Sequence, residues 1–160
     1  MAAWTLVFAL VTTSSLVGIS EQLQGVNYSP VFSGLNVAAI SNNCLSCICH
    51  VEGCERQVGK CRMDRGSLSC GPFQIKEPYW IDCGRPGTGW QPCAKQMVCS
   101  VNCVRAYMER YGTYCTGGRP PTCEDYAKIH NGGPRGCTKP LESYWRRVKA
   151  CCDASFGGRC

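Results

Sequence analysis

The stretch "RMDRGSLSCGPFQIKEPYW", residues 62–80, combines short apolar segments with residues that bend the chain. Gly66 and the pair Gly71-Pro72 interrupt it at two points, and such interruptions are typical of hairpin turns and bends. The segment from Arg62 to Lys76 therefore predicts a small antiparallel sheet. Asp64 lies just before the first bend, so it is either a surface residue of a turn or a member of a functional site.

The sixteen cysteines set a second constraint on the fold. All of them lie between Cys44 and Cys160, at a density above the level that marks disulfide scaffolds. Disulfides persist in oxidising compartments, so the sequence predicts an extracellular protein with eight bridges. The sequence "CLSCIC" at 44–49 contains one CxxC pair. Because no second CxxC accompanies it, we expect no zinc site, and we expect no other metal or cofactor.

Helical periodicity is the third signal. Apolar residues recur at three- and four-residue intervals in several segments, and glycines such as Gly53 and Gly112 follow them as stop signals. Residues 83–93, rich in glycine and proline, predict a loop. The pattern predicts helices over residues 43–52, 94–112, 123–133 and 141–152. The expected fold class is therefore α+β: a mainly helical domain with a small antiparallel sheet and many disulfides.

The N-terminal region differs from the rest of the chain. Residues 1–20 contain no charged side chain and form an apolar run that ends in small residues, which predicts a secretory signal peptide. Residues 21–43 contain no cysteine, and we interpret them as an N-terminal arm or propeptide. Residues 44–160 then form one domain of ordinary size.

The net charge of +6 lies outside the predicted signal peptide. A basic secreted protein is attracted to anionic surfaces such as bacterial envelopes, although the same charge also serves solubility. We expect peripheral attraction to anionic cell envelopes and no nucleic-acid partner. We also expect a monomer that forms at most a weak dimer.

Two of the eleven carboxylates stand in contrasting surroundings. Glu52 lies on a predicted helix among apolar residues and cysteines, a setting that favours the protonated form required of a general acid. Asp64 opens a polar turn whose N–H groups and hydroxyls can keep it ionised. Such a pair suits cleavage of a glycosidic bond. The alternative is an exposed helix residue and a turn-forming aspartate, which is the commoner case.

A nucleophilic serine is a second candidate chemistry. Ser67 and Ser69 lie near Lys76 in sequence, and His130 is a further base, so a Ser-Lys or Ser-His system can be assembled. No GxSxG sequence surrounds either serine. Serines in strand turns and a lysine at a strand end are the simpler interpretation.

Several long motifs resemble the invertebrate-type lysozyme family, also called the destabilase family, from about Cys44 to Cys151. They are "CLSCIC", the following Glu52, "CRMDRGSLSCGPFQIKEPYWIDCG", "PTCEDYAKIHNGGPRGC" and a late "YW". The resemblance implies a lysozyme-like domain and a secreted muramidase for antibacterial defence or digestion. Its substrate would be the β-1,4 bond between N-acetylmuramic acid and N-acetylglucosamine in bacterial peptidoglycan.

The resemblance also implies roles for individual residues. Glu52 matches the proton donor and Asp64 the nucleophile. The residues matching the sugar-binding cleft are Lys76, Tyr79, Trp80, Asp82, Tyr107, His130, Asn131 and Gly132. The aromatic members suit stacking against sugar rings, and core packing is the alternative role for any of them.

Two other functions stay open. Some members of the family resemble bifunctional enzymes with an isopeptidase activity attributed to a serine and a lysine or histidine. The matching residues here are Ser67, Ser69, Lys76 and His130. A non-catalytic cationic antimicrobial or glycan-binding protein is the remaining alternative.

The chain departs from the family pattern at three places. Gly53-Cys54 stands where the family usually has Ser-Gly. Arg65 replaces a small apolar residue after the aspartate, and a cation there would favour an ionised Asp64. Cys152 and Cys160 lie beyond the usual last cysteine, and we expect them to bridge each other as a C-terminal staple.

Overall fold

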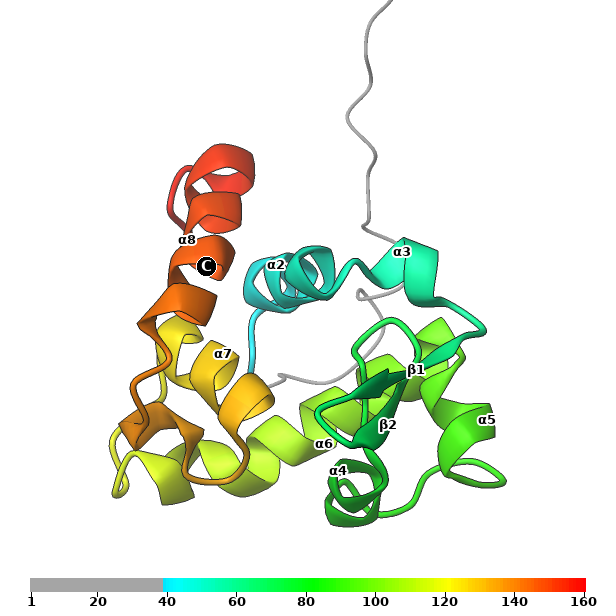
Figure 1. Cartoon of the computed structure of the whole chain (residues 1–160). Coiled ribbons are helices and arrows are strands. Elements are labelled where there is room, and N and C mark those ends of the chain that lie inside the picture. Colours follow the sequence, from blue (N-terminus) through cyan, green and yellow to red (C-terminus); the bar gives the residue numbers. More distant parts are fainter. Residues whose placement is uncertain (1–38) are drawn as a thin grey trace, which may run out of the picture.

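The computed structural model describes residues 39–160, so the predicted signal peptide and most of the predicted arm lie outside the described residues. Figure 1 shows α2, α7 and α8 on one side, the hairpin with α4 and α5 on the other, and the long helix α6 passing beneath both. The elements are α2 (Asn42–Glu52), α3 (Cys54–Gln57), β1 (Cys61–Asp64), β2 (Ser67–Cys70), α4 (Glu77–Asp82), α5 (Trp90–Ala94), α6 (Met97–Cys115), α7 (Cys123–Gly132), the 3₁₀ helix η1 (Gly136–Thr138) and α8 (Glu142–Phe156). The α+β fold class is confirmed.

The predicted hairpin forms with antiparallel register, and Asp64 lies opposite Ser67. The two turn residues between them, Arg65 and Gly66, both have positive φ, at 48° and 79°. Two-residue turns of this kind match the twist of the strands. Because side chains alternate along a strand, Arg62 and Asp64 share one face of the hairpin.

The four predicted helices are present with shifted ends. Helix α2 begins at Asn42, and Ser41 caps it by accepting a hydrogen bond from the Cys44 N–H at 3.1 Å. Ile40, two residues before the helix, is already buried. Helix α6 continues past the stop expected at Gly112 and ends at Cys115, and the glycine leaves room for Tyr126 to pack closely. A Cβ at that position would lie 3.0 Å from the Tyr126 ring.

Three short α-helices, α3, α4 and α5, and the 3₁₀ helix η1 were not predicted. Helix α4 occupies a segment interpreted only as cleft lining, and α5 begins inside the predicted 83–93 loop. Each is held by disulfides near its end, Cys83–Cys103 for α4 and Cys93–Cys99 for α5.

All sixteen cysteines are paired, and the prediction of eight bridges is confirmed. Two bridges join the helix that carries Glu52 to its neighbours: Cys44–Cys123 to α7 and Cys47–Cys151 to α8. The others are Cys49–Cys54, Cys61–Cys70, Cys83–Cys103, Cys93–Cys99, Cys115–Cys137 and Cys152–Cys160. Long-range bridges of this kind restrict the unfolded chain most strongly.

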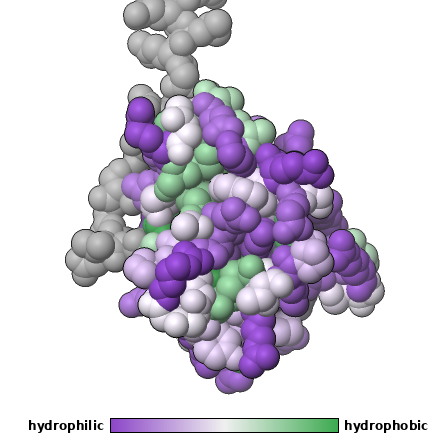
Figure 2. Space-filling model, turned by 90° about the vertical axis from the view of Figure 1, so that its left-hand side faces the viewer, coloured by the Kyte–Doolittle hydropathy of each residue, from purple (hydrophilic) through white to green (hydrophobic). Residues whose placement is uncertain are grey.

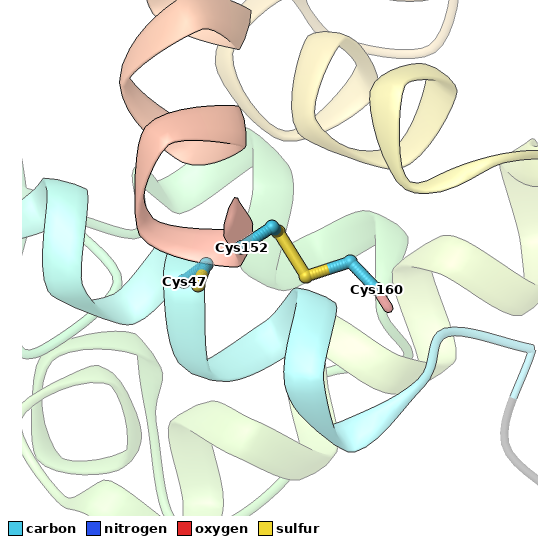
Figure 3. A group of neighbouring side chains, drawn as sticks. All are labelled: Cys47, Cys152 and Cys160. Atoms are coloured by element: carbon cyan, nitrogen blue, oxygen red, sulfur yellow. A yellow bond between two sulfur atoms is a disulfide. The ribbon is translucent and has the colours of Figure 1, made fainter. Parts of the chain in front are cut away.

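The expected C-terminal staple is confirmed, since Cys152 bonds Cys160 (Figure 3). The Ser41 hydroxyl donates to the Cys160 carbonyl at 2.7 Å, so the stapled end packs on the start of α2. The sulfurs of Cys47, Cys152 and Cys160 lie within 4.8 Å of one another. All three are in disulfides and therefore lack the thiolate that binds a metal.

The surface is mainly polar on the face formed by α7 and α8. In Figure 2 hydrophilic residues cover most of this face and hydrophobic residues form small separate patches. Among the helices of residues 39–160, none has the length and apolar character needed to cross a membrane.

Candidate active site

Glu52 is placed by the end of helix α2. Gly53 stops the helix in the left-handed conformation, with φ of 72°, and its N–H bonds the carbonyls of Cys49 and His50. The Glu52 side chain points into a cleft but is only 13% exposed. This position agrees with the predicted setting of a partly desolvated carboxyl group.

Tyr144 from α8 holds one oxygen of this carboxyl group. Its hydroxyl donates a hydrogen bond to Glu52 Oε1 at 2.7 Å. Burial is the main cause that raises the pKa of Tyr144 well above its usual value, and the nearby Glu52 raises it further. The hydroxyl therefore keeps its proton and remains a donor. The Tyr144 hydroxyl therefore occupies Oε1 and fixes the orientation of the carboxyl group.

Removing this hydroxyl is expected to impair catalysis. For Tyr144→Phe we expect kcat to fall about tenfold with KM unchanged, and the free energy of unfolding to drop by about 1–2 kcal/mol, because a buried oxygen loses its donor. Steady-state kinetics and denaturant unfolding measure the two effects. Tyr126→Phe is the matched control, since Tyr126 is buried outside the cleft. Equal losses of activity in both variants would contradict the assignment.

His130 lies beside the same carboxyl group, with Nε2 3.9 Å from Glu52 Oε1. Nε2 also lies 3.1 Å from the Phe73 carbonyl, which can only accept, so Nε2 carries the hydrogen. Nδ1 then accepts from the Tyr79 hydroxyl at 3.3 Å. Burial lowers the pKa of His130, and it outweighs Glu52 and the Phe73 carbonyl, which raise it. The imidazole is therefore neutral at pH 7 and orients its neighbours by hydrogen bonds.

This neutral histidine is expected to make stability depend on pH. An unfolded histidine binds a proton below about pH 6.5, whereas folded His130, with its lowered pKa, does so only at lower pH. Stability should therefore fall as pH drops through 6.5, with a slope of up to about 1.4 kcal/mol per pH unit from this group. His130→Gln should flatten the fall, measured by urea unfolding from pH 7.5 to 5. Replacing the exposed His50 by Gln is the control, and parallel profiles for native protein and His130→Gln would contradict the prediction.

Asp64 is placed at the tip of the hairpin, across the cleft from α2. Its side chain is 45% exposed, in contrast with Glu52. Lys76 Nζ lies 3.3 Å from Asp64 Oδ2 and donates to the Asp64 carbonyl at 2.8 Å. The polar, solvated surroundings expected for this aspartate are therefore present.

Both carboxyl groups line one cleft of about 470 Å³. Its walls come from α2, the hairpin, α4, α6, α7 and α8, so residues far apart in sequence meet there. Most of the residues predicted for the sugar cleft line it: Lys76, Tyr79, Asp82, Tyr107, His130 and Asn131.

Trp80 and Gly132 are not among the residues that line the cleft. The Trp80 indole N–H donates to the Pro86 carbonyl at 3.0 Å and its ring packs on the core. Gly132 packs against Leu141, so close that a Cβ would lie 2.6 Å from a Leu141 methyl group, and its neighbour Gly133 faces the cleft instead.

Tyr79 and Tyr107 line the cleft and also pack in or against the hydrophobic core, the alternative role considered for the aromatic residues. Tyr79 stacks on Tyr107 with ring centroids 3.6 Å apart, and Tyr107 is only 2% exposed. Burial raises the pKa of both hydroxyls. Tyr107 therefore supports Tyr79 from beneath, and Tyr79 is the ring better placed to meet a ligand.

The predicted serine system is only partly assembled. Lys76 Nζ lies 2.5 Å from Ser67 Oγ, so this pair is in contact. Ser69 is 1% exposed, and its hydroxyl has no hydrogen-bond partner within residues 39–160. His130 bonds Tyr79 and Phe73 rather than either serine.

Several cleft residues were missed by the sequence reasoning. Tyr144 belongs to the quoted "YW" motif, but nothing in its local pattern indicated a contact with Glu52. The other missed lining residues include Val51, Arg62, Arg65, Phe73, Gln74, Pro78, Pro134 and Arg147.

The fold and the cleft are those of a glycoside hydrolase of the lysozyme class, and known proteins of that class are similar to this chain. Residues 41–151 match the Destabilase family, and the chain belongs to this family. The C-terminal staple formed by Cys152 and Cys160 lies beyond the matched region.

Sequence and structure comparisons agree on the class. The chain is 55% identical to a lysozyme of Meretrix lusoria over 111 residues, 69% of this chain and 88% of that protein. It is 43% identical to an invertebrate-type lysozyme of Ruditapes philippinarum, over 83% of this chain and 94% of that one. The crystal structure of Tapes japonica lysozyme superposes with a TM-score of 0.65 at 47% identity, covering 72% and 93% of the two chains. The protein is therefore a lysozyme-type glycoside hydrolase, an enzyme that acts on a glycan.

Proposed function

We propose that the protein is a secreted muramidase that hydrolyses the β-1,4 bond between N-acetylmuramic acid and N-acetylglucosamine in bacterial peptidoglycan. The observation that carries this proposal is the pair Glu52 and Asp64, which line one cleft in contrasting surroundings. Glycosidic cleavage needs one carboxyl group as an acid and another as a carboxylate. Such an enzyme serves antibacterial defence or digestion with the same chemistry.

The proposed reaction uses the two groups in sequence. Glu52 gives its proton to the glycosidic oxygen, and ionised Asp64 attacks the anomeric carbon or stabilises the oxocarbenium-like transition state. Water then completes hydrolysis with Glu52 as base. Tyr144 and His130 position Glu52, and Lys76 anchors the turn that carries Asp64.

Sugar binding is assigned to the residues around this pair. Tyr79 offers an aromatic ring, while Lys76, Asp82 and Asn131 offer polar contacts from three sides of the cleft. Tyr107 and Trp80 support this surface from within the fold.

Analysis of reaction products tests the bond specificity. Digestion of purified peptidoglycan should release fragments whose reducing end is N-acetylmuramic acid, identified by borohydride reduction and mass spectrometry. Fragments ending in N-acetylglucosamine, or no soluble fragments, would contradict the proposal.

The positive net charge is assigned to attraction toward anionic cell envelopes. We expect lysis of whole bacteria to fall several-fold as salt rises from 0.02 to 0.3 M, because ions screen such attraction over about 10 Å at 0.1 M. Cleavage of a soluble neutral oligosaccharide should change little over the same range. A fall of equal size for both substrates would contradict envelope attraction. We propose no nucleic-acid partner and a monomer that dimerises at most weakly.

Secretion is proposed from the N-terminal sequence together with the eight disulfides, which fit an oxidising compartment. We propose removal of residues 1–20 as a signal peptide, followed by an arm or propeptide over residues 21–43. N-terminal sequencing of the protein secreted by expressing cells tests both cleavages, and a secreted form that retains Met1 would contradict them.

Isopeptide hydrolysis is a second candidate, favoured by the contact between Ser67 and Lys76. A lysine within reach of a serine hydroxyl can act as its base. An isopeptide substrate should be cleaved by the native protein and not by Ser67→Ala, while wall lysis by this variant persists. Ser69→Ala is the control, since Ser69 is buried and its hydroxyl has no hydrogen-bond partner among the described residues.

A further inference from the structure

The cleft contains cationic side chains that its own carboxylates do not pair with. Among the described residues that line it, the cations are Arg62, Arg65, Lys76 and Arg147, and the carboxylates are Glu52, Asp64 and Asp82. Lys76 pairs with Asp64. Within residues 39–160 none of the three arginines has a carboxylate oxygen within the 4.0 Å of a salt bridge.

Two of these arginines are nevertheless held in place by uncharged partners. Arg62 Nε donates to Gln74 Oε1 at 2.6 Å, and Gln74 in turn donates to the Gly71 carbonyl at 2.7 Å. The Arg147 guanidinium lies 5.3 Å from the centre of the Tyr144 ring, the same tyrosine that bonds Glu52. Cations fixed in this way keep their charge available to a ligand.

Arg65 occupies a backbone position that does not suit it. Its φ of 48° is in the left-handed region, which side chains with a Cβ rarely adopt. Asparagine or glycine is preferred at this position of a two-residue hairpin turn. An arginine kept at a strained position on the rim of a cleft points to a role for its charge.

We infer that Arg62, Arg65 and Arg147 bind carboxylate groups of the substrate on both walls of the cleft. This inference rests on the proposed function, because each N-acetylmuramic acid carries a lactyl carboxyl group, free or extended by an acidic peptide. The three arginines then make the enzyme select acidic glycans over neutral polymers of N-acetylglucosamine. The two walls that carry them flank Glu52 and Asp64, so the charge lies beside the bond to be cut.

A comparison of two substrates tests this selection. One is a peptidoglycan fragment freed of phosphate-bearing polymers, and the other is a neutral hexamer of N-acetylglucosamine. For Arg62→Gln, Arg65→Gln and Arg147→Gln we expect kcat/KM on the acidic fragment to fall about two- to fivefold each, and about tenfold or more in the triple variant, with the neutral rate within twofold of native. Arg65→Lys should keep most of the preference.

Arg85→Gln is the matched control for Arg65. Arg85 is also exposed and also has positive φ, at 56°, but it lies outside the cleft. Arg65→Gly adds a second readout, because it relieves the backbone while removing the charge. It should leave the melting temperature equal or higher and still weaken the acidic preference.

Binding separates this inference from the proposed function. Calorimetry of both ligands with the Glu52→Gln protein measures the acidic preference without any catalysis, and the triple arginine change in that background should abolish it. An unchanged ratio of affinities, or an equal loss for both ligands, would overturn the inference. Failure of the native protein to cleave either substrate would overturn the proposed function instead, and the calorimetry would still decide the role of the arginines.

Discussion

Glu52→Gln is expected to reduce lysis of bacterial walls by about 10²- to 10⁴-fold, the contribution usual for a general acid. Glutamine keeps the size of the side chain and can still accept the Tyr144 hydrogen bond, so the fold should be preserved. It cannot give a proton to the glycosidic oxygen. The loss of turbidity of a bacterial wall suspension measures the rate, and circular dichroism checks the fold.

Glu55→Gln is the matched control for this change. Glu55 is exposed on α3 and lies outside the cleft, so its rate should stay close to that of the native protein. Were the Glu52→Gln protein to clear walls as fast as the native one, Glu52 would not be the general acid of this hydrolysis.

Asp64→Asn is the second change with a large expected effect. The amide has the same shape but no negative charge, so it can neither attack the anomeric carbon nor stabilise a positive transition state. We expect a fall of about 10²- to 10³-fold in kcat, comparable with the loss of other electrostatic stabilisers of a transition state. Reducing-sugar release from soluble peptidoglycan fragments measures it.

Asp153→Asn controls for the loss of a paired aspartate, since Asp153 pairs with Lys149 at 2.6 Å and neither residue lines the cleft. If kcat of Asp64→Asn falls by less than tenfold, Asp64 takes no direct part in the reaction, and Glu52 has no second carboxylate acting with it.

Local signals were sufficient for most of the fold. Gly66 marks the hairpin turn, Gly53 marks the end of α2, and long periodic runs mark α6 and α8. Helices α4 and α5 have only six and five residues, too few for a periodic pattern. Disulfides and tertiary packing stabilise such short helices, and their sequences alone do not indicate them.

The site was predictable only in part, for a related reason. The surroundings of Glu52 and Asp64 made them candidates but left the exposed-residue alternative as the commoner case, and the motifs around them singled them out; the structure places both in one cleft. Tyr144 bonds a residue 92 positions away, and no local pattern predicts such a contact. Trp80 matches a cleft motif, but its indole N–H donates to the Pro86 carbonyl and its apolar ring packs against the hydrophobic core.

The most direct test is a crystal structure of the Glu52→Gln protein with a peptidoglycan fragment longer than the cleft. We predict that one glycosidic oxygen lies within hydrogen-bond distance of the residue-52 amide and that the adjoining anomeric carbon faces the Asp64 carboxylate. A fragment bound in another groove, or one in which the two side chains meet different sugar bonds, would contradict the account.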